Sequence, residues 1–240
     1  MIRALGAAGL ALIVAAGAAC GSGSKKDAAA ANAPASAEKK GPLPGLDTEP
    51  PVRPKIVALG DSITAGLGVF QNDAYPAQLQ HLIDADGYNV EVVNAGESGD
   101  TSATALRRVD FVLDPTVKIL VVAVGGNDAL RGVSPKATHD NVLAIVKKAQ
   151  DKGVDVILTG MQAPPNLGED YANGFRQVFY QVARETSARF VPFLLEGVAG
   201  DPKLNQDDGI HPTAEGHKII AGLIYDKLKP LLDDLANRTP

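Results

Sequence analysis

A serine, a histidine and an aspartate in this chain have the neighbours that nucleophilic catalysis requires. Ser62 ends the motif Gly60-Asp61-Ser62 after a short apolar run, and Asp208 precedes His211 by three residues in "DGIHP". A serine hydroxyl becomes a nucleophile when a base takes its proton, and a carboxylate fixes the tautomer of that base. The set predicts Ser62 as nucleophile, His211 as base and Asp208 as the acid that orients it. We expect the adjacent Asp207 to face solvent.

Candidate donors for the oxyanion of a tetrahedral intermediate are also present. They are the backbone N–H of Ser62, the backbone N–H of Gly96 and the side-chain amide of Asn127 in "GGND". Each candidate taken alone has a plainer reading. Serines cap helices, glycines and asparagines fill turns, and a lone histidine is often a cap or a surface residue. We expect Asp61 and Asp128 to bond loop backbone.

The elements that must position these residues alternate along the chain from Lys55 onward. Short β-branched runs predict five buried strands, at 56–59, 90–93, 119–124, 154–158 and 190–193. Apolar residues at helical spacing lie between and after them, and we expect Pro230 to end or kink the last helix. This alternation predicts an α/β fold with a parallel sheet covered by helices on both faces. The loops after the strands, which carry the candidate residues, should then meet at one edge of the sheet.

The first 54 residues differ from the rest. A basic start is followed by an uncharged Ala/Leu/Gly run and by Cys20, the one cysteine in the sequence. This pattern predicts an export signal over residues 1–20, and the run is too short for a membrane anchor. "GAAC" resembles a bacterial lipoprotein site with a lipidated Cys20, although Gly17 departs from the usual Leu-like residue. Ordinary cleavage at Ala16-Gly17-Ala18 is the alternative.

Residues 21–54 are rich in Ala, Gly, Ser, Pro and Lys and predict a flexible linker. The expected organisation is therefore signal, linker and one domain over residues 55–240. A lipidated Cys20 would tether that domain to a membrane. We expect an exported protein of the cell envelope, on the periplasmic side or as an outer-membrane lipoprotein.

Composition narrows the function classes. The 240 residues are 45% hydrophobic with a net charge of −5. This is enough apolar material for one core, and the acidic balance argues against nucleic acid as a partner. The histidines and the cysteine lack zinc spacing. No Gly-x-Ser-x-Gly elbow surrounds Ser62, and no Gly-x-Gly-x-x-Gly follows the first expected strand.

Four motifs together are much more specific than any one of them. "GDSITAG", "NAGESGDTS", "GGND" and "DGIHP" occur here in the order of the SGNH hydrolases, also called GDSL hydrolases. The chain closely resembles this family from Lys55 to Pro240, and "GGNDALRG" resembles its subgroup of bacterial arylesterases and thioesterase I/lysophospholipase L1. The resemblance implies a three-layer, flavodoxin-like α/β/α fold. It also implies a Ser62–His211–Asp208 triad, oxyanion donors at Ser62, Gly96 and Asn127, and acyl transfer without metal or cofactor.

The substrate is left open by these residues. The resemblance implies hydrolysis of small esters or thioesters, of longer acyl lipids or acyl thioesters, or of acetyl groups on envelope polysaccharide. A non-enzymatic envelope-binding module that kept the fold is the remaining alternative, although a binder needs no triad. Several apolar residues either line an acyl groove or pack in the core: Leu67, Val69, Phe70, Met161, Pro164 and Pro165. The oligomeric state is also open.

Overall fold

Five parallel strands form one sheet in the computed structural model, which describes residues 53–238. The strand order is β2-β1-β3-β4-β5. The expected three-layer α/β fold with a five-stranded parallel sheet is therefore confirmed. The strands are β1 (Lys55–Gly60), β2 (Glu91–Gly96), β3 (Val117–Ala123), β4 (Asp155–Thr159) and β5 (Arg189–Val191).

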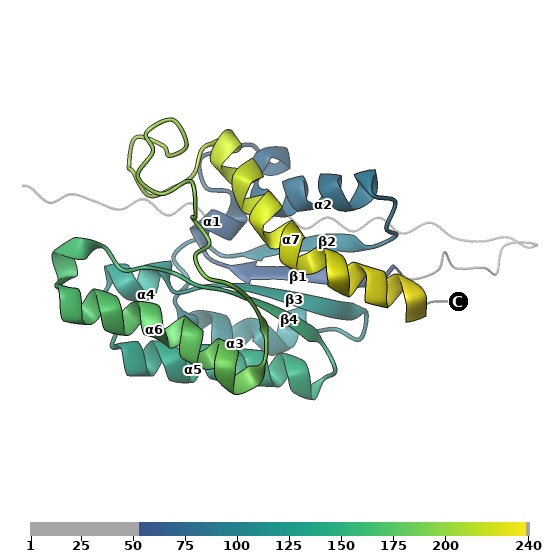
Figure 1. Ribbon diagram of the computed structural model, residues 1–240, viewed down its shortest axis with the longest axis horizontal. Helices are drawn as coiled ribbons and strands as arrows, with labels where there is room; N and C mark the ends of the chain where they lie inside the picture. The colour runs from purple at the N-terminus through teal and green to yellow at the C-terminus, as the bar shows by residue number, and fades with distance from the viewer. Residues whose placement is uncertain (1–52, 239–240) are drawn as a thin grey trace, which may run out of the picture. The chain divides into compact units, whose positions relative to one another are not determined.

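Helices cover both faces of the sheet. The helices α2 and α7 pack together on one face, and α3, α5 and α6 cover the other (Figure 1). Two short helices, α1 and α4, follow β1 and β3. Within residues 53–238, no helix is both long enough and apolar enough to cross a membrane. The helices are α1 (Ser62–Ala65), α2 (Tyr75–Ala85), α3 (Ser102–Val112), α4 (Gly126–Leu130), α5 (Pro135–Asp151), α6 (Glu169–Thr186) and α7 (Ala214–Arg238), with 3-10 turns η1 (Gln71–Asp73) and η2 (Pro165–Leu167).

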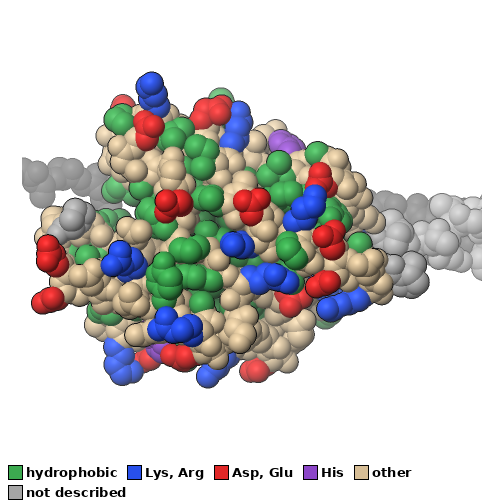
Figure 2. Space-filling view, in the orientation of Figure 1, with side chains coloured by type: hydrophobic (Ala, Val, Ile, Leu, Met, Phe, Trp, Pro, Cys, Tyr) green, Lys and Arg blue, Asp and Glu red, His purple; other side chains and the backbone are tan. Residues whose placement is uncertain are grey.

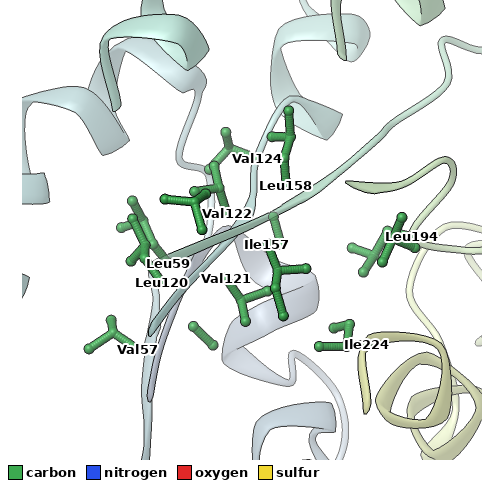
Figure 3. Close-up of a cluster of buried hydrophobic side chains, with 14 of the residues drawn as sticks. Val57, Leu59, Leu120, Val121, Val122, Val124, Ile157, Leu158, Leu194 and Ile224 are labelled. Atoms are coloured by element: carbon green, nitrogen blue, oxygen red, sulfur yellow. The ribbon is translucent and has the colours of Figure 1, made fainter. Parts of the chain in front are cut away.

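The core lies on both faces of the three central strands. Apolar side chains of β1, β3 and β4 point alternately to the two helical layers, and those of α7 and of the segment after β5 meet them (Figure 3). The buried stripe of α6 comprises Phe175, Val178, Phe179 and Val182, as its helical spacing predicts. On the face shown in Figure 2, acidic and basic side chains are interspersed around smaller apolar areas.

Two expected element ends are wrong. The strand β2 continues to Gly96 and is only partly buried, because it lies at the edge of the sheet. The helix α7 does not end at Pro230 but runs on to Arg238. Leu231 and Leu232 are buried just beyond that proline, and their packing offsets the backbone hydrogen bond that proline cannot donate.

The strand order places the polar loops at a topological switch point. The chain moves from β1 to β2 on one side and then returns to place β3 on the other side of β1. The loops after β1 and β3 therefore leave neighbouring strands at the carboxyl edge of the sheet. In open α/β sheets, this is where ligands bind.

Candidate active site

The turn after β1 presents Ser62 and does not use it as a helix cap. Asp61 is the N-cap of α1, and its carboxylate accepts the N–H of Ile63 at 3.1 Å. Ser62 is the first residue of the helix, which leaves its hydroxyl available. Its Oγ lies 2.8 Å from Nε2 of His211. The plainer reading of Ser62 as a cap is therefore wrong.

The histidine and the aspartate meet as their spacing predicts. His211 Nδ1 lies 2.6 Å from Asp208 Oδ2, while Asp208 Oδ1 accepts the N–H groups of Ile210 at 2.8 Å and of His211 at 2.9 Å. The hydrogen bond from the His211 ring and these two backbone donors lower the pKa of Asp208 to about 2. Asp208 is therefore anionic near neutral pH. It favours the tautomer with a proton on Nδ1, which leaves Nε2 to accept from Ser62.

A glutamine that the motif analysis did not single out supports this loop. The side-chain amide of Gln206 donates to the carbonyls of Leu67 at 2.8 Å and Pro212 at 2.9 Å, and its backbone N–H donates to His211 at 2.8 Å. These bonds connect the loop of His211 to the segment after α1. Asp207 is exposed, as expected.

Gly96 does not lie in the wall around Ser62, which corrects the sequence assignment. It is the last residue of β2, paired with Gly60, and its N–H donates to the side chain of Asn94 at 2.9 Å. A β-carbon at Gly96 would lie 2.2 Å from the backbone nitrogen of Ala65. Gly96 is thus required for close packing of β2 against α1, and its amide already has an acceptor.

Gly99 occupies the position that Gly96 was expected to fill. It borders the same cavity as Ser62, Asn127 and His211, and it has a positive φ of 88°. Within the described residues its N–H donates to no protein group. The motif "NAGESGDTS" contains both glycines, so Gly99 could have been considered from the sequence. The expected strand ended three residues too early to separate them.

The amide of Asn127 is held with one hydrogen still available. Its Nδ2 donates to the carbonyl of Asp100 at 2.9 Å, and an amide nitrogen carries two hydrogens. The neighbouring Asp128 is fully buried and accepts the backbone N–H of Ser102 at 2.7 Å as well as the hydroxyl of the same serine. Asp128 thus has the structural role that its position predicts.

Two adjoining cavities lie over these groups. One of about 240 Å³ is bordered by Ser62, His211, Asn127, Gly99 and Leu67. The second, of about 330 Å³, shares part of its lining with the first and is largely apolar. It is lined by Ile63, Gly126, Leu130, Met161, Gln162, Ala163, Pro164, Phe193, Leu195, Ala199, Asn205, Gly209 and Ile210.

Only some of the six residues expected to line an acyl groove or pack in the core border one of the two cavities. Leu67 borders the first cavity, and Met161 and Pro164 border the second. Phe70 is 83% exposed, and neither Val69 nor Phe70 lines either cavity. The side chain of Pro165 lies outside the described part of the structure. Ile63 lines both cavities and was not predicted from the sequence.

Comparison with known proteins places the chain among acyl hydrolases. The profile of the GDSL-like lipase/acylhydrolase family matches residues 58–219. Esterase TesA of Pseudomonas aeruginosa is 39% identical over 178 residues, which cover 74% of this chain and 89% of that protein. Thioesterase 1/protease 1/lysophospholipase L1 of Escherichia coli is 33% identical over 179 residues, covering 74% and 85%. A crystal structure of TesA superposes with a TM-score of 0.71 at 38% identity, covering 74% of this chain and 99% of the other.

Proposed function

Because the chain belongs to the GDSL-like lipase/acylhydrolase family, we propose that Ser62, His211 and Asp208 carry out its ester or thioester hydrolysis through an acyl-serine. The observation that carries this proposal is the continuous line of contacts from Ser62 Oγ to His211 Nε2, 2.8 Å, and from His211 Nδ1 to Asp208, 2.6 Å. A serine, a base and an orienting carboxylate in this arrangement form a nucleophilic triad.

The first half-reaction transfers the acyl group to the enzyme. Ser62 Oγ attacks the substrate carbonyl carbon while its proton moves to His211 Nε2, and the carbonyl electron pair moves to oxygen. The resulting oxyanion accepts from the N–H groups of Ser62 and Gly99 and from the second hydrogen of Asn127 Nδ2. The intermediate collapses, the bond to the leaving oxygen or sulfur breaks, and His211 protonates the leaving alcohol or thiol.

The second half-reaction repeats the chemistry with water. Water gives a proton to His211 and attacks the acyl-serine carbonyl, and the same three donors hold the second oxyanion. Collapse breaks the bond to Ser62 Oγ, which recovers its proton from His211 as the acid leaves.

Removal of the Asn127 donor in Asn127→Ala should lower kcat by roughly 10²–10³-fold. A kcat near the wild-type value would exclude that role for Asn127.

The apolar cavity supports an acyl chain as the group that binds beside Ser62. It adjoins the first cavity through the shared Ile63, Leu130 and Ile210. Each methylene buried there contributes about 0.8 kcal/mol, which is roughly a fourfold gain in kcat/KM. This observation favours acyl esters and acyl thioesters over acetylated polysaccharide, whose acetyl group would leave the cavity empty.

The test is hydrolysis of p-nitrophenyl esters from acetyl to palmitoyl by the full chain, with Ser62→Ala in parallel. We expect kcat/KM to rise from acetyl through the medium chains and activity to vanish in the variant. A kcat/KM that falls for chains longer than acetyl would show that the acyl chain does not bind in the apolar cavity, and would favour small esters as substrates. Undiminished turnover in Ser62→Ala would reject the triad, and no turnover of any ester by wild type would favour the binding module.

We also propose that the protein is exported and held at the cell envelope by a lipidated Cys20. This cysteine and the linker over residues 21–54 lie almost wholly outside the described residues, so support comes from their sequence. In the described domain, β1 begins at Lys55, at the sheet edge opposite Ser62. The expressed protein should partition into detergent, and this partitioning should be lost in Cys20→Ser. Unchanged partitioning in the variant would show that Cys20 is not the lipidated residue.

A further inference from the structure

One guanidinium joins the turn of the nucleophile to the loop of the oxyanion donors. Arg108, on the second turn of α3, donates from Nε to Asp100 Oδ2 at 2.6 Å and from Nη2 to the carbonyl of Gly60 at 2.9 Å. Gly60 directly precedes the Asp61-Ser62 turn, and Asp100 directly follows Gly99. The two side chains of the ion pair are only 21% and 14% exposed.

The contacts of Asp100 extend this junction to the third donor. Its carbonyl accepts from Asn127 Nδ2 at 2.9 Å, and its own N–H donates to Glu97 at 3.0 Å. The orientation of the Asn127 amide therefore depends on where the Asp100 peptide lies. Each candidate oxyanion donor therefore lies close to one of these hydrogen bonds. Ser62 is two residues after Gly60, Gly99 directly precedes Asp100, and Asn127 itself donates to the Asp100 carbonyl.

We propose that Arg108, paired with Asp100, is a positioning residue for the oxyanion site, a role that rests on the acyl-transfer function proposed above. Donors stabilise a transition state only when they are held within about 0.5 Å of the productive position. Arg108 fixes two of the three segments to each other through its planar fork, which bonds a carboxylate and a carbonyl at once. It touches no reacting atom and acts through Gly60 and Asp100.

Other polar contacts near this site do not connect the same two segments as Arg108. Asp128 anchors the start of α3 through Ser102, and the exposed Arg131 donates to the carbonyl of Gly99 at 3.0 Å. Neither contact involves β1, the strand that ends at Gly60. Arg107 supplies a matched control, because it is the adjacent arginine on the same helix and is exposed. Among the described residues, its side chain hydrogen-bonds only to the carbonyl of Ala103 in its own helix, at 3.4 Å.

The experiment is a double-mutant cycle in the full chain with Arg108→Gln, Asn127→Ala and the double variant, measured as kcat and KM for one ester. If Arg108 acts through the oxyanion site, Arg108→Gln should lower kcat roughly 10–100-fold with KM within about threefold. In the Asn127→Ala background the same change should lower kcat at least about threefold less than it does in the wild-type background, since one of the three donors that Arg108 positions is already gone. Arg107→Gln should leave both constants unchanged.

The opposing result is an equal loss in both backgrounds, or a loss of melting temperature with unchanged kcat per folded enzyme. Either would make the pair a structural ion pair only. If Arg108→Gln does not fold, Arg108→Lys replaces it in the cycle, because it keeps the charge and loses the fork. Failure of the proposed function itself would appear separately, as activity that survives Ser62→Ala.

Discussion

Asp61 and His217 are buried titratable side chains whose ionisation changes stability with opposite signs. Burial raises the pKa of Asp61 to about 6, an effect that the hydrogen bond from the Ile63 N–H and the electrostatic interaction with His211 oppose in part. Burial lowers the pKa of His217 to about 4. Its Nδ1 accepts the N–H of Tyr75 at 3.2 Å, and its Nε2 has no partner within the described residues.

The two shifts should tilt the pH dependence of folding in opposite directions. Asp61 is more easily protonated in the folded than in the unfolded chain, so its contribution is present below pH 4 and lost as pH rises through 6. His217 is harder to protonate when folded, so its contribution is present above pH 6.5 and lost as pH falls towards 4. Each shift corresponds to about 3 kcal/mol, and between pH 4 and 6 the two largely cancel.

Single substitutions should uncover each slope. Asp61→Asn keeps an acceptor for Ile63, so relative to wild type its unfolding free energy should rise with pH from 4 to 6.5, by up to about 3 kcal/mol. His217→Gln keeps an acceptor for Tyr75 and should show the opposite relative slope. Urea unfolding across this pH range measures both, with the exposed Asp207→Asn as control. Parallel curves for wild type and both variants would refute the assignment.

Gly96, at the end of β2, and Gly99, in the loop after it, are glycines for different physical reasons. A β-carbon at Gly96 would collide with backbone of α1 at 2.2 Å. At Gly99 the nearest atom would be the tip of Arg131 at 3.7 Å, although the φ of 88° is unfavourable for alanine. The first glycine is a packing requirement, and the second supplies one of the proposed oxyanion donors.

Alanine at each position should therefore have a different effect. Gly96→Ala should lower the unfolding free energy by about 1–3 kcal/mol or more, through overpacking. Gly99→Ala should cost only about 1–2 kcal/mol through its left-handed conformation, but should reduce kcat because the N–H moves. Melting temperature and kcat measured on both variants decide this. A selective kcat loss in Gly96→Ala would restore the original assignment.

The segment after β4 offers a direct test of the acyl cavity. Ala163 is half-buried and lines the apolar cavity. Ala163→Phe should fill part of it and lower kcat/KM for an octanoyl ester at least about tenfold, while acetyl ester turnover changes less than twofold. Ala236→Phe, on the exposed end of α7, is the matched control. Equal losses for both esters would mean that the acyl chain lies elsewhere.

Sequence patterns located the elements better than their ends. Continuous β-branched runs marked β1, β3 and β4, but Asn94, Ala95 and Gly96 lack strand-like side chains, so the length of β2 was missed. That error put Gly96 in the loop in place of Gly99. Likewise Pro230 is a helix breaker by local rules, but α7 continues past it, with Leu231 and Leu232 buried directly after the proline.

At the scale of the whole domain, the proximity of Ser62, His211 and Asp208 was predictable, and the contacts that support their loops were not. Ser62 and His211 are 149 residues apart, yet each stands in a short motif, Ser62 directly after β1 and His211 in the segment that joins β5 to α7. The segments that follow parallel strands lie at the same edge of the sheet, which brings the two motifs together. Arg108 and Gln206 carry no such motif. Arg108 meets Gly60 across 48 residues, and Gln206 meets Leu67 across 139, so only the fold reveals these contacts.

The most direct test of the account is to find where a covalent inhibitor binds. The full chain would be treated with a p-nitrophenyl alkylphosphonate, and the adduct located by peptide mass spectrometry while residual esterase activity is followed. We expect one phosphonyl group per chain, on Ser62, with activity lost in proportion to labelling and with much slower labelling in His211→Ala. Inactivation with the label on another residue, or full activity with Ser62 labelled, would contradict the assignment of Ser62 as nucleophile.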